Sequence, residues 1–223
     1  MLKLSTSDLR RYASCAFALL FGVLQACTTT GPEGMPPAGV QVQARSETIS
    51  SWLPGPSEPG ARSPTVTRRD LVAFEDALTA IREGRAQAAE VLLRQITAEQ
   101  PGLAGPWVNL GQVYVSQERY EDARLAFKNA IVANPRSCHA YNQLGVLARQ
   151  LGDFRGAEEL YQACLKQMPE FKDAYLNLGI LYELYLGRLP EALAAYRRYQ
   201  SLSSEPDRKV LGWVMDLERR LGV

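Results

Sequence analysis

The stretch that decides the fold runs from Trp107 to Pro135 and reads WVNLGQVYVSQERYEDARLAFKNAIVANP. Its Leu-Gly pair at 110–111 returns at 144–145 and at 178–179, each time 34 residues further on. The proline that ends the stretch has counterparts at the same spacing, Pro101 before it and Pro169 after it. A fixed period of this size indicates repeated supersecondary units that stack into a solenoid. The sequence therefore predicts a repeat solenoid as the folded part of the chain.

The repeated positions resemble those of the tetratricopeptide repeat (TPR), in which each unit is a pair of antiparallel helices. The resemblance covers about residues 70–206 and implies an all-α solenoid of four helix-turn-helix repeats, at 70–103, 104–137, 138–171 and 172–206. The second repeat has the fullest match, at Trp107, Leu110, Gly111, Tyr114, Ala123, Phe127, Ala130 and Pro135. The third matches at Tyr141, Leu144, Gly145, Ala157, Tyr161 and Pro169, and the fourth at Tyr175, Leu178, Gly179, Tyr182, Ala192 and Tyr196. The first repeat is degenerate and keeps mainly Ala77, Gly84, Ala89, Leu93 and Pro101.

Local signals agree with this division. A glycine inside a helix costs about 1 kcal/mol relative to alanine, so we expect close helix packing at Gly111, Gly145 and Gly179. Ser137 and Asp153 stand where each would cap a helix. The fourth repeat has one residue more than the others between its two helices, and we expect it in the turn around Leu186-Gly187-Arg188.

Residues 207–223 follow the last repeat and have helical spacing of apolar side chains, at Val210, Leu211, Trp213, Val214, Leu217 and Leu221. We interpret this segment as a C-terminal capping helix, because the last unit of a stack otherwise exposes its apolar side. A free docking helix is the alternative.

The N-terminus has the layout of an export signal. Lys3, Arg10 and Arg11 precede an apolar stretch, Tyr12–Leu24, that is too short to span a bilayer comfortably. The stretch ends in Leu24-Gln25-Ala26-Cys27, which resembles the lipobox of bacterial lipoproteins. The resemblance implies cleavage after residue 26 and acylation (palmitate) of Cys27, and Thr28 after the cysteine implies sorting to the periplasmic face of the outer membrane. The alternatives are a signal cleaved elsewhere or a short uncleaved anchor.

Residues 27–69 are predicted to be a flexible tether, because proline and glycine interrupt any regular element. The one apolar spot in this tether is Trp52-Leu53, which is either a small docking anchor or an ordinary loop element.

The sequence offers little chemistry. His139 is the only histidine, so neither a Ser–His–Asp arrangement nor a histidine metal site is indicated, and we expect no enzymatic activity and no cofactor. A formal net charge of +1 gives no electrostatic footprint for nucleic acid. Acidic pairs such as Glu121-Asp122 and Glu158-Glu159 are interpreted as solvated helix surfaces. For Cys138 and Cys164 we expect packed thiols, with a disulfide as the alternative.

The TPR resemblance implies a concave groove lined by the first helix of each repeat. Its predicted partner-binding residues are Phe74, Leu78, Val108, Asn109, Gln112, Val115, His139, Asn142, Gln143, Val146, Arg149, Leu176, Asn177 and Ile180. Further groove positions are Leu71, Ile81, Asp173 and Glu183. Lysines that hold a C-terminal carboxylate in one TPR subtype are missing, so an apolar groove with a few amides favours an amphipathic helix or an extended peptide.

The sequence therefore predicts a lipid-anchored scaffold that binds another envelope protein. Such an architecture resembles TPR lipoproteins that assist assembly of pilus secretins (pilotins), and others that serve cell-wall or trans-envelope machines. A structural lipoprotein that self-associates through its repeats is the alternative.

Overall fold

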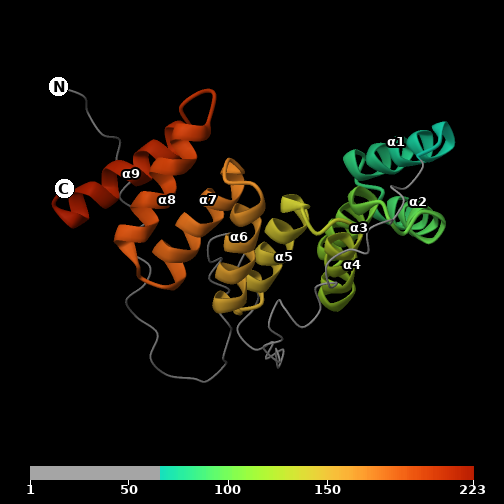
Figure 1. The fold of residues 1–223 in the computed structure, drawn as a ribbon, viewed down its shortest axis with the longest axis horizontal. Coiled ribbons are helices and arrows are strands. Elements are labelled where there is room, and N and C mark those ends of the chain that lie inside the picture. Colours follow the sequence, from blue (N-terminus) through green and yellow to red (C-terminus); the bar gives the residue numbers. More distant parts are fainter. Residues whose placement is uncertain (1–65) are drawn as a thin grey trace, which may run out of the picture. The chain divides into compact units, whose positions relative to one another are not determined.

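The computed structural model describes residues 66–223 (Figure 1). The predicted signal peptide, Cys27 and Trp52 lie outside the described residues. Helix α1 begins at Arg68, two residues before the predicted start of the first repeat at Asp70.

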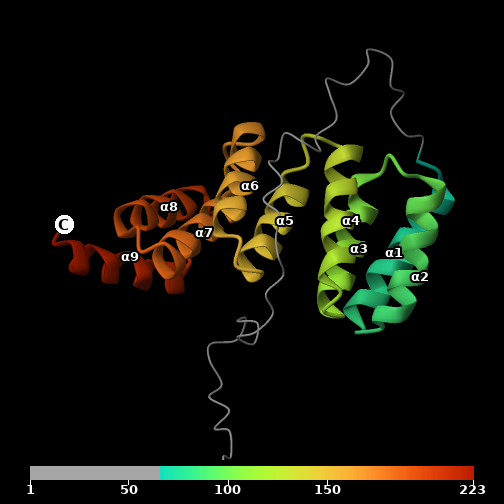
Figure 2. The same ribbon diagram turned by 90° about the horizontal axis from the view of Figure 1, so that it is seen from below.

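The described residues form helices and no strands, and the helices pair in chain order. The first repeat consists of α1 (Arg68–Arg82) and α2 (Ala86–Glu99), and the second of α3 (Ala104–Ser116) and α4 (Tyr120–Ala133). The third consists of α5 (Cys138–Gln150) and α6 (Phe154–Gln167). In the fourth, α7 (Lys172–Ile180) continues into a π-helical turn (Leu181–Tyr185) and pairs with α8 (Leu189–Leu202). Each pair packs on the next, as Figure 2 shows, and the predicted all-α solenoid of four helix pairs is confirmed.

The mid-helix glycines lie where the two helices of a repeat touch. A Cβ atom added at Gly111 would stand 2.4 Å from the Phe127 ring, and one at Gly145 would stand 2.6 Å from the Tyr161 ring. At Gly179 the corresponding distance to the Tyr196 ring is 2.3 Å. Phe127, Tyr161 and Tyr196 are themselves buried. The close packing expected from the helical glycines is therefore confirmed.

Side-chain caps fix where several helices begin. Ser137 accepts a hydrogen bond from the Ala140 amide, and Asp153 accepts one from the Gly156 amide, as predicted. Thr67 and Asp70 form a reciprocal capping box at the start of α1. The Asp70 pKa is lowered, first by hydrogen bonds from Thr67 to its carboxylate.

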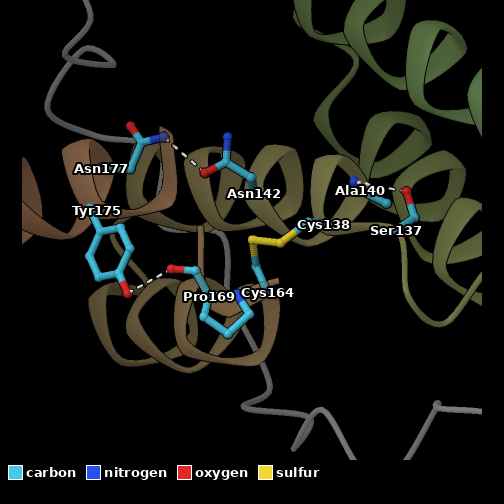
Figure 3. The surroundings of a disulfide bond; sticks show 8 residues. All are labelled: Ser137, Cys138, Ala140, Asn142, Cys164, Pro169, Tyr175 and Asn177. Atoms are coloured by element: carbon cyan, nitrogen blue, oxygen red, sulfur yellow. Dashed lines mark hydrogen bonds between the residues drawn. A yellow bond between two sulfur atoms is a disulfide. The ribbon is translucent and has the colours of Figure 1, made fainter. Parts of the chain in front are cut away.

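Aromatic side chains near the start of a first helix reach back to the preceding proline. Trp107 Nε1 donates to the Pro101 carbonyl at 3.0 Å, and the Tyr175 hydroxyl donates to the Pro169 carbonyl at 3.1 Å (Figure 3). The polar edge of each ring thus satisfies a carbonyl at the joint between repeats, while its apolar body packs against the core.

Arginines that begin second helices connect neighbouring repeats. Arg119 precedes α4, lies 4.3 Å from the Tyr114 ring centroid, and donates at 2.9 Å to both carboxylate oxygens of Glu90 on α2. Arg188 before α8 repeats this arrangement with Tyr182 and with Glu158 on α6.

The interpretation of the acidic pairs as solvated helix surface fits Glu121 and Asp122, whose side chains are 60% and 50% exposed, but Glu158 is only 21% exposed. Asp122 pairs with Arg119 at 2.7 Å, and Glu158 accepts hydrogen bonds from Arg188 and from the Tyr182 hydroxyl. The sequence pattern did not reveal the contact of Glu158 with Arg188, because the two residues are 30 positions apart.

The extra residue of the fourth repeat does not lie in the turn, which corrects the prediction. In all four repeats the middle residue of the turn has a positive φ: Gly84, Glu118, Gly152 and Gly187. The Leu186-Gly187-Arg188 turn thus has the same form as the others. The additional residue is instead absorbed by the π-helical turn Leu181–Tyr185, whose hydrogen bonds span one residue more than those of an α-helix.

Cys138 and Cys164 form a disulfide, so the expectation of packed thiols is wrong (Figure 3). Their Cα atoms are 4.6 Å apart, within the range that a disulfide bridges. Both residues are buried, and the bond ties the start of α5 to the C-terminal half of α6. Burial alone predicted small packed side chains, but it gave no information on how close the two sulfur atoms lie.

Helix α9 (Arg208–Leu221) packs on α8 and buries Val210, Val214 and Leu217. Asp207 caps it by accepting from the Lys209 and Val210 amides. Leu211 is 39% exposed, so it lies on the outer face of α9 although its spacing grouped it with the buried residues. The predicted C-terminal helix is present and covers the last repeat.

Candidate functional site

The predicted groove residues lie on the first helices of the repeats, and α5 contacts both α3 and α7. A small cavity of about 90 Å³ opens between α3 and α5. Its lining residues are Gln112, Val115, Gln143, Val146, Leu147 and Gln150. Four of these six were predicted for the groove. Leu147 and Gln150 were missed, although each lies one helical turn after a predicted residue, Gln143 and Val146 respectively.

This cavity combines an apolar floor with neutral polar walls. Leu147 is fully buried and Val115 and Val146 are half-buried, while the three glutamines carry amide groups that both donate and accept hydrogen bonds. None of the described residues that line the cavity carries a charge. The arrangement suits an uncharged segment of chain whose own backbone groups need partners.

Several other predicted groove residues are buried or hydrogen-bonded within the solenoid. Val108 and Asn142 are buried, and Asn142 accepts a hydrogen bond of 3.0 Å from the Asn177 amide (Figure 3). Asn109 donates to the Gly105 carbonyl one turn earlier on its own helix. These side chains hold α5 against α7 or fix their own helix, and they present less surface to a partner than the sequence suggested.

The ends of α5 carry the two ionisable residues of the predicted set. His139 is exposed and meets the Phe171 ring edge-on, with 4.9 Å between centroids. Arg149 is half-buried and lies 5.6 Å from the Tyr185 ring centroid. Burial raises the pKa of the Tyr161 hydroxyl to about 12, and the nearby positive charge of Arg149 opposes this shift.

In the flanking repeats the predicted residues are mainly packing residues. Phe74 and Ile180 are half-buried against the core, as is Leu176, and Leu78 is half-buried on α1. Phe74 approaches the backbone of α3, since a Cβ atom at Gly105 would be 3.8 Å from its ring.

Among the additional groove positions, Leu71 is 54% exposed. Glu183 accepts a hydrogen bond from the Tyr196 hydroxyl at 3.0 Å and pairs with Arg220 at 3.2 Å. Burial and the Glu183 charge raise the Tyr196 pKa above its usual range.

Residues 66–223 contain neither a candidate metal site nor a candidate membrane span. No cluster of three or more histidine, cysteine, aspartate or glutamate side chains there could hold a metal ion. No helix in the same range is long and apolar enough to cross a bilayer.

Three overlapping parts of the chain, residues 74–137, 108–163 and 142–206, match the family model described as Tetratricopeptide repeat. The chain belongs to the tetratricopeptide-repeat family. TPR proteins are in general non-catalytic scaffolds that bind other proteins, and the helix pairs above are the TPR units of this chain.

Solved TPR structures share the fold at low sequence identity. PilF of Pseudomonas aeruginosa is 17% identical, with a TM-score of 0.62 and coverage of 69% of each chain. MamA from Desulfovibrio magneticus RS-1 is 16% identical, with a TM-score of 0.58, over 71% of this chain and 88% of MamA. Because the sequence identities are so low, these two comparisons show a shared fold alone.

Two curated proteins share a part of the TPR region. Protein O-mannosyl-transferase tmtc2 of Xenopus laevis is 33% identical over 95 residues, which is 41% of this chain and 11% of that protein. Human Superkiller complex protein 3 is 29% identical over 90 residues, or 40% of this chain and 6% of that protein. The chain therefore matches only a small fraction of either relative, and the match concerns the repeats.

Proposed function

We propose that this TPR protein is a lipid-anchored adaptor, attached through Cys27 to the periplasmic face of the outer membrane. It binds another envelope protein through the groove that is lined by the first helix of each repeat. This binding assists assembly of a cell-envelope complex, such as a pilus secretin. The observation that carries the binding part is the cavity between α3 and α5, since its uncharged lining and open amides suit a peptide segment.

The Cys138–Cys164 disulfide supports a periplasmic location for this domain. Structural disulfides persist in oxidising environments such as the bacterial periplasm and are rare in the cytosol. The Cys138–Cys164 bond is buried within one repeat, so it acts as a structural link and not as an exposed reactive thiol pair. An exported domain fits both this bond and the lipobox-like sequence that ends at Cys27.

Site-specific photocrosslinking in cells tests the binding surface. A photoreactive amino acid is placed at Gln112 or Gln143, and at Arg155 as a control, because Arg155 is on the exposed side of α6 with 89% of its side chain accessible. We expect one envelope protein to be crosslinked from the two groove positions and not from residue 155. A Val146→Arg change should remove the crosslink, because it places a charge in an uncharged cavity.

Capture of the same proteins from all three positions, or of cytosolic proteins only, would contradict this adaptor function. A crosslinked second copy of the chain would instead support the structural, self-associating alternative.

The lipid anchor is tested separately. A Cys27→Ser variant should leave the membrane fraction, and its retention there would argue against lipidation at that residue.

A further inference from the structure

A second and larger cleft lies outside the predicted groove, where α2 and α4 flank α3. Its volume is about 330 Å³, within the range of small-ligand sites. Helix α2 contributes Arg94, Thr97 and Ala98, α3 contributes Trp107, Leu110 and Tyr114, and α4 contributes Asp122, Leu125, Ala126 and Asn129. The cleft exists because two small residues, Ala98 and Ala126, line it from the two flanking helices. The position equivalent to Ala126 in the next repeat, 34 residues further on, is the larger Leu160.

The inner part of the cleft is apolar and incompletely covered. Leu110 and Ala126 are buried and Trp107 is half-buried, yet Leu125 is 59% exposed at the rim. A single large side chain, such as that of tryptophan, leucine or phenylalanine, would fill this space and cover Leu125. Such aromatic anchors carry much of the binding energy in protein interfaces.

The polar rim has unused hydrogen-bond donors. Arg119 takes both oxygens of Glu90 at 2.9 Å and also pairs with Asp122 at 2.7 Å, so it occupies both acids near the rim. Among the described residues, Arg94 pairs with Glu90 alone, at a longer distance of 3.6 Å, and 66% of its side chain is exposed. The Tyr114 hydroxyl and the Asn129 amide hydrogen-bond to none of the described residues. A carboxylate is the group that accepts from such donors most strongly.

We propose that this cleft binds a segment of a partner protein that places a large apolar side chain next to an acidic residue. The apolar side chain enters between Ala98 and Ala126, and the carboxylate pairs with Arg94. This site is independent of the cavity between α3 and α5, so its occupancy does not depend on the adaptor function above.

The test is a titration of the full chain, labelled with ¹⁵N, with two peptides that differ only in the acidic group. The peptides are acetyl-Gly-Glu-Trp-Gly-amide and acetyl-Gly-Gln-Trp-Gly-amide. The Trp107 indole N–H and the Asn129 side-chain amide report on the cleft. We expect millimolar binding of the glutamate peptide, about two- to fivefold tighter than the glutamine peptide, with the difference reduced by salt.

Two variants place the binding in the cleft. Arg94→Gln should make the two peptides equal, while Arg155→Gln, an exposed arginine on α6, should not. Ala126→Leu should abolish binding by filling the cleft. Because Leu160 is accommodated at the equivalent position and is 5% exposed, this variant should stay folded, which its helical circular dichroism and melting temperature check.

Three results with peptide would overturn the proposal. They are no shift at Trp107 and Asn129 up to saturating peptide, equal binding of both peptides in the native chain, and unchanged binding by a folded Ala126→Leu variant. Concentration-dependent shifts at the same groups without any peptide would also overturn it, because they would show that a second copy of the chain occupies the cleft.

Discussion

Replacing a mid-helix glycine separates packing from helix propensity in this fold. Gly145 on α5 faces Tyr161, which is 0% exposed, and an added Cβ atom would lie 2.6 Å from its ring. Gly212 on α9 is the matched control, because an added Cβ atom there meets nothing within 4 Å. Both glycines are helical, so alanine gains about 1 kcal/mol of helix propensity at either position.

The difference between Gly145→Ala and Gly212→Ala therefore measures overpacking. Inserting a methyl group into a filled core costs about 1–3 kcal/mol. We expect Gly212→Ala to raise the melting temperature slightly and Gly145→Ala to lie below it by about 2 kcal/mol, or about 4–8 °C for a chain of this size. Gly145→Leu should lower stability further and collapse the third repeat.

Thermal and urea unfolding followed by circular dichroism provide the measurement. The same pair of substitutions in a Tyr161→Val background gives a double-mutant cycle, in which the penalty at Gly145 should vanish because the ring is gone. Equal shifts for Gly145→Ala and Gly212→Ala would refute the reasoning, and with it the register of the third repeat.

Three further perturbations test other contacts. Reducing the Cys138–Cys164 bond, or replacing both cysteines by serine, should lower the free energy of unfolding by about 3–4 kcal/mol, because the bond closes a loop with a sequence separation of 26. Urea unfolding with and without a reductant measures this difference, and no change would mean that the bond does not form. Stability should fall as pH rises from about 10 towards 12, because the Tyr161 pKa is raised to about 12 in the fold and its neutral form is the one that the fold favours. A Tyr161→Phe variant should lose less stability over this range, and an equal loss in the variant and the native chain would contradict this. Arg119→Ala should cost about 2 kcal/mol, because it leaves the buried Glu90 carboxylate with only the longer contact to Arg94, and the additional change Glu90→Gln should recover part of that loss. A double variant no more stable than the single one would argue against the ion pair.

Sequence reasoning succeeded where a local pattern reflects a local contact. The positions of Gly111, Gly145 and Gly179 predicted the sites of closest helix approach, because only a small residue allows the ring opposite to fit. Ser137 and Asp153 predicted two helix starts for a similar reason, since a cap involves residues three positions apart. The four-repeat fold follows from contacts of this kind repeated at a fixed interval.

The candidate site was predicted less completely, because exposure depends on neighbours that the pattern does not identify. Asn142 stands on the correct face of α5 for the groove, yet its amide pairs with Asn177 of the next repeat. Gln150 was missed although it lines the cavity, because it lies at the end of α5, beyond the positions transferred from the family. The cleft beside Trp107 was not predicted at all, since it depends on two alanines on different helices.

The π-helical turn of the fourth repeat shows why a correct count of residues did not locate the additional residue. The sequence shows that the fourth repeat has one residue more than the others. From the sequence alone, a longer turn between the helices and a wider turn within the first helix accommodate this residue equally well. The turn is constrained, because its middle residue must adopt a positive φ between two fixed helix ends, and Gly187 meets that need as Gly84 and Gly152 do. The end of the first helix is less constrained, since Leu184 can remain 68% exposed while Leu181 and Tyr182 stay in the core. The extra residue is thus absorbed where one side chain can be turned to solvent without loss of a buried contact, and Glu183 of the widened turn is placed against Tyr196 and Arg220.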